Sequence, residues 1–353
     1  MKSKKRILVA PLNWGLGHTT RCIPIINALL AHNFEVLVAS DGIALELLKK
    51  EFPALIALEL PPYNITYAKK GKHFKMKLIQ DSPRLIKAIQ NEKKIIAKIV
   101  KDHDIDGIIS DNRLGVQYKG LPCAFITHQL QVLSGNTTWI STKLHQKIIK
   151  RFDECWVPDN IGEPNLSGKL GHANIYDIPL KYIGPLSRFT PEERPTKIDI
   201  LVLLSGPEPQ RSMLEALLLD TFKDDQRNVT LIRGVVEEQQ RITKLGAVTI
   251  YNFMTSEELN DTINESELII SRSGYTTLMD LAKLNKKAYF IPTPGQFEQE
   301  YLADRLTELG IVPSCHQNKF TAEKLNEIAE YSGLSTMDYD MNFKKLFSLF
   351  QSE

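Results

Sequence analysis

The sequence predicts an α/β protein built from two doubly wound parallel-sheet domains that face each other across a cleft. Three observations support this fold class. Apolar strand patterns alternate with helix patterns along most of the chain, which is typical of parallel sheets with crossover helices. The alternation stops at residues 190–197, where two prolines and four charges lie among eight residues, and then restarts. The length of 353 residues fits two domains, each with its own core.

Taken in order, the apolar patterns of the first half predict six strands and four helices. The strands are expected at residues 6–10, 35–39, 55–60, 107–110, 123–127 and 154–157, and the helices at about 18–32, 43–52, 83–101 and 140–152. After the linker, further strands are expected at residues 198–204, 229–233, 248–251, 267–270 and 288–291. We therefore expect an N-terminal domain over residues 1–189 and a C-terminal domain over 197–338. The apolar tail, about 340–353, is expected to pack back on the first domain.

The composition is that of an ordinary soluble globular protein. Hydrophobic residues make up 42% and charged residues 24% of the chain, and the net charge of +2 gives no indication of nucleic-acid binding. The four cysteines are scattered without a Cys-x-x-Cys pair, which argues against a disulfide framework or a zinc cluster. The sequence has neither a signal-peptide core nor an apolar run of about 18 residues. It therefore predicts a cytoplasmic protein.

One segment of the chain is strongly basic. Residues 69–101 contain eleven lysines and arginines against only Asp81 and Glu92, and apolar residues are interleaved near the start. Such a segment could rest on an anionic membrane surface, which would place the protein at the inner face of the membrane. The alternative is a solvent-exposed helix face plus a loop, and the sequence leaves both interpretations open.

The stretch from Leu268 to Ala303 carries the strongest functional pattern. An apolar strand runs into a helix through a turn of small residues and one arginine, Ser271, Arg272, Ser273 and Gly274. Such a turn presents free backbone N–H groups and the positive end of the helix dipole to an anion. Asp280, about one and a half turns into the helix, can reach a ribose hydroxyl, and Gln299 and Glu300 add groups for sugar hydroxyls. Together they predict a nucleotide-sugar site.

Two more loops follow predicted strands and lead into helices. The first ends in His18 and also contains Asn13, Gly15 and Gly17, and its glycines let the backbone approach a ligand closely. A dinucleotide fingerprint would need a third glycine, which is absent. The second loop contains Ser205 and Gly206, which can offer a hydroxyl and an N–H group to a phosphate and so form the opposite wall of the same pocket. The alternatives are a helix-starting histidine that bonds only locally and a turn without a ligand.

The content and order of these motifs resemble the MurG-like glycosyltransferases of family 28. The match is closest over about residues 251–303, and the loop ending in His18 is similar to the family's N-terminal glycine-rich loop. The resemblance implies the two-domain GT-B fold and inverting transfer of a sugar, expected to be a hexose, from a nucleotide-diphosphate donor. That donor is expected to be a UDP-sugar. The resemblance also implies that Phe253 lies near the base, that Met254 contacts it through the main chain, and that Arg188 contacts the diphosphate.

The resemblance further implies that the reaction requires neither a metal nor a cofactor. The Asp-x-Asp patterns at residues 102–106 precede a predicted strand, at the wrong end of a sheet for a ligand in the cleft, and we interpret them as a solvated turn. The leaving diphosphate is then expected to be stabilised by the helix dipole, by the N–H groups of Ser273 and Gly274, and by Arg188.

His18 is the expected general base, because an imidazole titrates near neutral pH and its loop should face the gap between the domains. Asp111 and His128, each directly after a first-domain strand, are the alternatives for this role, and each could instead bond only locally. The sequence does not identify the acceptor, which we expect to be a small molecule or a lipid-linked component of the cell envelope. Asp280 and Glu300 stand where the family has glutamate and glutamine, and the second change bears on which sugar fits.

Three other functions stay open at this level. A nucleotide-sugar epimerase or hydrolase of the same fold would turn over the donor alone. A non-catalytic nucleotide-sugar-binding protein would show no activity that depends on the candidate bases. A nicotinamide-dependent dehydrogenase is disfavoured, because the dinucleotide fingerprint is incomplete.

Overall fold

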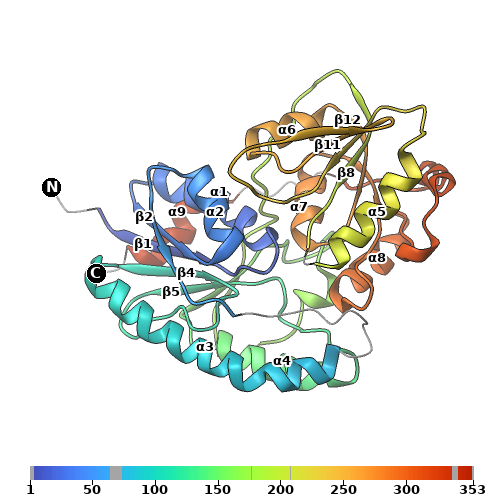
Figure 1. Ribbon diagram of the computed structural model, residues 1–353. Coiled ribbons are helices and arrows are strands. Elements are labelled where there is room, and N and C mark those ends of the chain that lie inside the picture. Colours follow the sequence, from blue (N-terminus) through green and yellow to red (C-terminus); the bar gives the residue numbers. More distant parts are fainter. Residues whose placement is uncertain (1–3, 64–73, 176, 207, 336–340, 352–353) are drawn as a thin grey trace.

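The computed structural model describes residues 4–63, 74–175, 177–206, 208–335 and 341–351. They form two α/β domains, each built around its own sheet, and the chain passes from one to the other between residues 182 and 198 (Figure 1). The predicted fold class, two domains with doubly wound parallel sheets, is confirmed.

The N-terminal sheet has seven described strands, all parallel, in the order β3-β2-β1-β4-β5-β6-β7. The strands are β1 (Arg6–Pro11), β2 (Glu35–Ser40), β3 (Ile56–Glu59), β4 (Gly107–Asp111), β5 (Cys123–Ile126), β6 (Glu154–Val157) and β7 (Leu180–Tyr182). The helices that accompany them are α1 (Gly17–Ala31), α2 (Gly42–Glu51), α3 (Phe74–Asp102) and α4 (Thr138–Ile149).

The C-terminal sheet has six described strands in the order β10-β11-β9-β8-β12-β13. They are β8 (Ile198–Leu203), β9 (Val229–Ile232), β10 (Ile242–Leu245), β11 (Val248–Tyr251), β12 (Ser266–Ser271) and β13 (Lys287–Phe290). The helices of this domain are α5 (Gln210–Phe222), α6 (Ser256–Asn264), α7 (Tyr275–Lys283) and α8 (Phe297–Glu308). All pairings are parallel except that of β10 with β11.

Strand β1 shows why the strands appear in the sequence as continuous apolar runs. Ile7 and Val9 belong to one buried cluster, and Leu8 and Ala10 belong to another on the opposite face of the sheet. All four side chains are fully buried. Successive residues of a strand point to opposite faces, so a sheet covered by helices on both sides requires apolar residues at every position.

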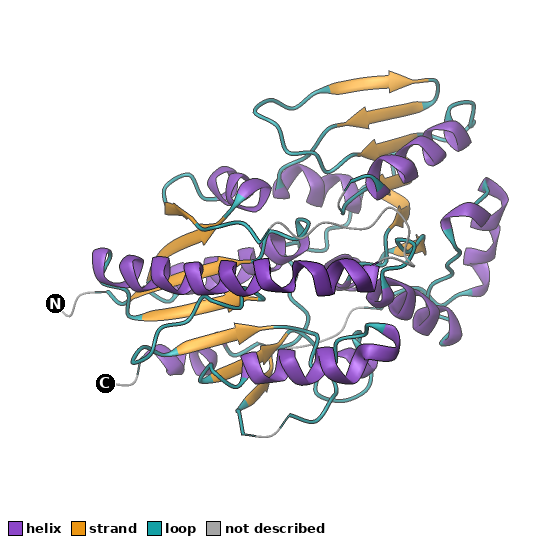
Figure 2. Cartoon of the chain, turned by 60° about the horizontal axis from the view of Figure 1, so that its bottom comes forward, coloured by secondary structure: helices purple, strands orange, loops and turns teal. Residues whose placement is uncertain are grey.

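The C-terminal tail returns to the first domain. Helix α9 (Phe343–Leu346) and the turn after it bury Phe347 and Phe350 completely, and both rings meet the ring of Phe34 edge-on, at 5.7 and 6.5 Å between centroids. The two ends of the chain accordingly lie at the same side of the molecule in both views (Figures 1 and 2). The tail is therefore part of the N-terminal core.

Three elements differ from the sequence prediction. Helix α3 begins at Phe74 rather than near residue 83, and strands β7 and β10 were not expected. Every residue of β10 is exposed, so this strand lacks the buried pattern that marks the others. Its antiparallel pairing with β11 depends on Gly246, which adopts a φ of +56° and lies so close to the Lys223 carbonyl that a side chain would not fit.

The basic segment at residues 69–101 falls partly outside the described residues. Lys87, Lys94, Lys98 and Lys101 lie on the solvent side of the last turns of α3. Among the described helices, none combines the length and the apolar character needed to cross a membrane.

The two sheets share one topological plan, and this plan locates the site. In each sheet the strand order reverses beside the first strand, so that β1 lies next to β4 and β8 lies next to β12. The connections of such neighbouring strands leave on opposite sides and open a crevice at the carboxyl ends. The loops after β1, β4, β8 and β12 are therefore where a ligand is expected to bind.

Candidate active site

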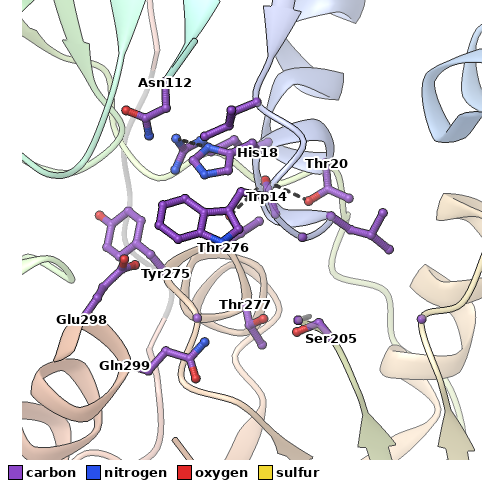
Figure 3. Close-up of a pocket in the computed structure, with 18 of the residues that line it drawn as sticks. Trp14, His18, Thr20, Asn112, Ser205, Tyr275, Thr276, Thr277, Glu298 and Gln299 are labelled. Carbon is purple, nitrogen blue, oxygen red and sulfur yellow. Dashed lines mark hydrogen bonds between the residues drawn. The ribbon is translucent and has the colours of Figure 1, made fainter. Parts of the chain in front are cut away.

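A cavity of about 460 Å³ lies between the two domains at these loops (Figure 3). Twelve of the residues predicted from the sequence line it: Gly15, Gly17, His18, His128, Arg188, Ser205, Gly206, Phe253, Met254, Gly274, Asp280 and Gln299. In Figure 3, His18 and Asn112 lie on one side of the ring of Trp14, and Thr277, Ser205 and Gln299 lie on the other. Six predicted residues are not part of the lining: Asn13, Asp111, Ser271, Arg272, Ser273 and Glu300.

His18 lies in the first turn of α1, and Asp111, the last residue of β4, holds its ring. The Nδ1 atom of His18 is 2.7 Å from Oδ1 of Asp111, which is fully buried. Nη2 of Arg21 also lies 2.9 Å from this Nδ1 atom, but it already donates to Oδ1 of Asp111. The shorter contact joins Nδ1 to an ionised carboxylate, which is only an acceptor, so we place the proton on Nδ1. The Nε2 atom then keeps its lone pair. This is the arrangement that a general base requires.

Arg21 completes the group from one turn further along α1. Its side chain is 1% exposed, and its Nε and Nη2 atoms donate to the two carboxylate oxygens of Asp111. Sequence reasoning did not select Arg21, because it occupies the position where the missing third glycine was sought. A buried arginine needs a fixed anionic partner, which makes it an informative signal once burial is known.

The protonation states of Asp111 and His18 follow from their burial and from the positive charge of Arg21. Burial alone would raise the pKa of Asp111, but the charges of Arg21 and His18 outweigh it and lower that pKa to about 2. Burial, together with the positive charge of Arg21, lowers the pKa of His18 below its ordinary value of 6.5, although Asp111 opposes the shift. The imidazole is therefore neutral at pH 7 and able to accept a proton.

His128, which follows β5, contacts the other domain. Its ring stacks on that of Tyr275 with 4.1 Å between centroids, and its Nε2 atom is 2.9 Å from Oε1 of Glu298 on α8. Its Nδ1 atom is 3.0 Å from Nη1 of Arg21. Glu298 was not among the predicted site residues, since an acidic residue in the first turn of a helix is common for electrostatic reasons alone.

On the C-terminal wall, the first turn of α7 presents small neutral groups. Gly274 precedes the helix, and a Cβ built on it would meet only Thr277 Oγ1, at 3.9 Å, so space is open in front of it. The hydroxyl of Ser273 is turned away, because it donates to the carbonyl of Gln299 at 2.7 Å. In the loop after β8 of the same domain, Gly206 has a φ of +98° and nothing within 4 Å of its Cβ position. Both turns therefore leave backbone accessible to a ligand.

Arg272 and Glu300 support the pocket from behind. The buried guanidinium of Arg272 donates to the carbonyls of Ile291, Pro292 and Gln210, and burial lowers its pKa to about 10. The carboxylate of Glu300 accepts the N–H of Gly295 at 2.8 Å. Both side chains fix the loop after β13. They therefore lie away from the cavity, although the sequence pattern predicted that they belong to the nucleotide-sugar site.

The remaining predicted residues also have defined partners. Gln299 accepts the N–H of Thr293 at 2.8 Å, and the hydroxyl of Ser271 donates to the Arg272 carbonyl. Asn13 donates to Asp41 of the same domain at 2.9 Å. These bonds hold the loops that carry the lining residues.

Arg188 and Asp280 face the cavity from the domain junction. The guanidinium of Arg188 donates to the Ser256 hydroxyl at 2.9 Å, whereas its Nε–H is buried without a hydrogen-bond partner. An unpaired buried donor of this kind suits a ligand oxygen. Asp280 accepts the hydroxyl of Ser187 at 2.7 Å, and its burial raises its pKa to about 6 although Arg188 opposes the shift.

Within the described residues, no three His, Cys, Asp or Glu side chains are grouped as metal ligands would be. The Asp-x-Asp patterns at residues 102–106 lie just before β4, at the end of the sheet opposite the cavity. The independence from a metal remains a prediction.

Comparison with known proteins identifies the family of the C-terminal domain. Residues 200–342, which include the turn before α7 and the whole C-terminal wall of the cavity, match the glycosyltransferase family 28 C-terminal domain. This domain is that of a family 28 glycosyltransferase.

Relatives that align with nearly the full chain are described as glycosyltransferases or as N-acetylglucosamine transferases. An uncharacterized glycosyltransferase of Methanopyrus kandleri is 19% identical to this glycosyltransferase over 338 residues, covering 90% of this chain and 91% of the relative. A UDP-N-acetylglucosamine–N-acetylmuramyl-(pentapeptide) pyrophosphoryl-undecaprenol N-acetylglucosamine transferase of Pasteurella multocida is 22% identical over 332 residues, covering 92% and 88% of the two chains.

Solved structures share the fold. MurG of Acinetobacter baumannii superposes with a TM-score of 0.56 at 14% identity, covering 98% of this glycosyltransferase and 99% of that chain. The glycosyltransferase SnogD of Streptomyces nogalater gives a TM-score of 0.59 at 15% identity, covering 92% and 91%. The arrangement of the two domains is that of GT-B glycosyltransferases.

Proposed function

We propose that this protein is an inverting, metal-independent hexosyltransferase that uses a nucleotide-diphosphate sugar, with UDP as the nucleotide. The observation that carries the proposal is the pairing across one cavity of a neutral His18, oriented by a buried aspartate, with the open backbone turns at Gly206 and Gly274. One wall can accept a proton, and the other can hold an anionic leaving group.

In the reaction we propose, Nε2 of His18 removes the proton from the acceptor hydroxyl as that oxygen attacks the anomeric carbon. The carbon–oxygen bond to the diphosphate breaks, and the configuration at the anomeric carbon inverts. Asp111 keeps the imidazole in the correct tautomer and stabilises the imidazolium that forms.

The leaving diphosphate would lie at the N-terminus of α7. The free N–H groups of the first turn and the positive end of the helix dipole stabilise negative charge there, and the unpaired Nε–H of Arg188 adds one charge-assisted bond. Asp280 lines the same wall, where its carboxylate can accept a hydrogen bond from a ribose hydroxyl.

A thermal-shift screen against UDP-, GDP- and dTDP-sugars tests the donor. A ligand that binds only the folded state raises its melting temperature, and we expect the largest rise with a UDP-hexose. A rise with another nucleotide would correct the donor, and no rise with any nucleotide-sugar would overturn the proposal.

Incubation of the protein with the donor alone separates transfer from the epimerase and hydrolase alternatives. We expect the donor to persist until an acceptor is added. Rapid conversion or hydrolysis without an acceptor would favour one of those alternatives. Donor binding without any turnover, unaffected by substitution of His18, Asp111 or His128, would favour a binding protein.

For the acceptor, we propose a small molecule or a lipid-linked component of the cell envelope that is reached at the cytoplasmic face of the membrane. The exposed lysines of α3 support a peripheral contact with anionic lipid. Sedimentation with vesicles of anionic lipid at low and high salt tests this contact. We expect salt-sensitive binding, and the membrane proposal fails if the protein stays in the supernatant at low salt.

A further inference from the structure

A continuous chain of buried polar contacts connects the C-terminal domain to the base. It starts at Glu298 on α8, passes through His128 and Arg21, and reaches His18 through Asp111. Arg21, Asp111 and His128 are each at most 4% exposed, and the side chain of Glu298 is 18% exposed. His18, Arg21, His128 and Glu298 line the cavity between the two domains, so these contacts run along its wall.

The protons along this chain can be assigned from the donors and acceptors. A guanidinium has only donors, so Nη1 of Arg21 donates to Nδ1 of His128, which must be unprotonated. The proton of a neutral His128 then lies on Nε2 and is donated to Oε1 of Glu298 at 2.9 Å. The acceptor at Glu298 thus fixes one tautomer of His128, and that tautomer provides the acceptor for Arg21.

Arg21 connects the fixed tautomer of His128 to the orientation of His18. Its Nε and Nη2 atoms donate to the two oxygens of Asp111, and Asp111 in turn accepts the Nδ1 proton of His18. Nη2 also lies 2.9 Å from that Nδ1 atom. Without an acceptor on His128, one N–H of Arg21 would be buried and unpaired, which favours a different guanidinium position. The orientation of His18 therefore depends on a residue of the other domain.

Glu298 is also connected to the proposed donor site. It precedes Gln299, whose carbonyl accepts the hydroxyl of Ser273 and whose side chain holds the N–H of Thr293. The second carboxylate oxygen of Glu298 accepts from the side chain of Gln129, which again belongs to the first domain. Glu298 thus lies where the first turn of α8, the turn before α7 and the first domain meet.

We propose that Glu298 is a positioning residue, which through His128 and Arg21 orients the Asp111–His18 pair and couples this orientation to contact between the two domains. The inference rests on the proposed role of His18 as general base. Glu298 also lines the cavity, and the role proposed for it is to act through His128 and Arg21.

Nitrogen-15 NMR of the full-length protein labelled at histidine tests the assignment without a substrate. We expect His128 to carry its proton on Nε2 and His18 on Nδ1, with signals assigned by His128→Asn and His18→Ala. Glu298→Ala should shift His128 toward a mixture of tautomers, and Glu298→Gln, which still offers a carbonyl oxygen, should restore the Nε2–H form. A proton on Nδ1 of His128 in the native protein would overturn the proposal.

The control is Asp304→Asn, which removes one negative charge from an exposed position on the same helix. It should leave every histidine signal in place. Equal effects of the substitutions at 298 and 304 would mean a general effect on α8 and would also overturn the proposal. If Glu298→Ala does not fold, the Glu298→Gln protein and the native spectrum still decide between the outcomes.

A pH titration of the histidine signals in the same samples provides a second test. The pKa of His18 should change if Glu298 acts on it electrostatically, and should not change if Glu298 only stabilises the fold. His18 is surrounded by Asp111 and Arg21 of its own domain, by His128 beyond β5, and by Glu298 of α8. Removing the negative charge in Glu298→Gln should lower the pKa of His18 further, whereas Asp304→Asn should not. An unchanged titration of His18 in Glu298→Gln would contradict the electrostatic part of the coupling.

Kinetics provide the functional test once an acceptor has been found. Glu298→Ala should lower kcat by about tenfold while the dissociation constant of the donor changes by less than about threefold, because only the base is disturbed. Glu298→Gln should recover most of kcat. If nucleotide-sugars do not bind, the proposed function is refuted, but the NMR result on His128 and His18 still stands. Failure of the proposed function and failure of the inference about Glu298 are therefore distinguishable.

Discussion

The two walls of the cavity have different chemistry, although both arise from the same sheet topology. On the N-terminal wall a neutral His18 contacts the buried ion pair of Arg21 and Asp111. On the C-terminal wall the turns at Gly206 and Gly274 present neutral backbone with open space in front. A group that moves a proton must be held in one orientation, whereas a diphosphate can be bound by preorganised dipoles. The comparison therefore predicts different responses to substitution on the two walls.

Substitution of the base should produce the largest effect on turnover. His18→Ala should lower kcat by at least about tenfold and by as much as about 10⁴-fold, the upper end of what general bases contribute, with donor affinity retained. Steady-state kinetics and titration calorimetry with the donor would measure both quantities. His316→Ala, at an exposed position of the other domain, is the matched control. Unchanged kinetics in His18→Ala would move the role to Asp111 or His128.

Substitution of Asp111 should affect stability as well as activity. Asp111→Asn leaves Arg21 buried without its anionic partner, which should lower the free energy of unfolding by about 3–5 kcal/mol. Urea denaturation followed by tryptophan fluorescence would measure the loss.

The same pair predicts a pH dependence. The pKa of Asp111 is about 2 in the folded protein, below its unfolded value of about 3.9. Its contribution to stability is therefore complete above about pH 4 and is lost as the pH falls toward 2. This part of the acid sensitivity should be absent in Asp111→Asn. A variant as stable as the native protein at pH 7 would show that the ion pair does not support the wall.

On the opposite wall, Gly274→Ala should separate binding from folding. The added methyl group meets only Thr277, at 3.9 Å, and the φ of −72° is compatible with alanine, so the melting temperature should stay nearly unchanged. The same methyl group occupies the space where the diphosphate is proposed to approach, so donor affinity should fall by about tenfold, or about 1.4 kcal/mol. An unaltered dissociation constant would place the diphosphate elsewhere.

The contact between the two walls can be tested through its packing. A Cβ at Gly17 would lie 2.9 Å from Oγ1 of Thr276, which itself donates to the Gly17 carbonyl. Gly17→Ala should therefore cost about 1–3 kcal/mol by overpacking the interface. Thr276→Ala in the same protein removes the close atom and should recover most of the loss. If the double variant melts no higher than Gly17→Ala, the strain lies in another contact.

The predictions from sequence succeeded where one strand or loop decides the outcome. Buried strands such as β1 need apolar residues on both faces, and this requirement is visible as an uninterrupted run. The loops after these strands contain glycine, serine and histidine, and the sheet topology brings them to the cavity. Strand β10 was missed for the same reason, since all its residues are exposed and carry no such pattern.

The direction of individual side chains was not accessible in the same way. Arg272 belongs to the motif that marked the donor site, yet its guanidinium is used by three carbonyls behind the pocket. Arg21 and Glu298 carried no signal in the sequence, although both lie in the chain of contacts that ends at His18. Their importance depends on partners that are 90 to 170 residues away in the chain.

The sequence by itself determined the two-domain α/β architecture and the turns at the carboxyl ends of the strands, because strand periodicity and helix-starting glycines are local properties of the chain. Only the tertiary structure decided which ionisable groups are hydrogen-bonded to each other and which arginine faces the protein or the cavity. The physical reason is that a buried charge is stabilised by whichever partners the packing of separate elements brings within about 3 Å. In this glycosyltransferase those partners come from α1, β4, the loop after β5 and α8.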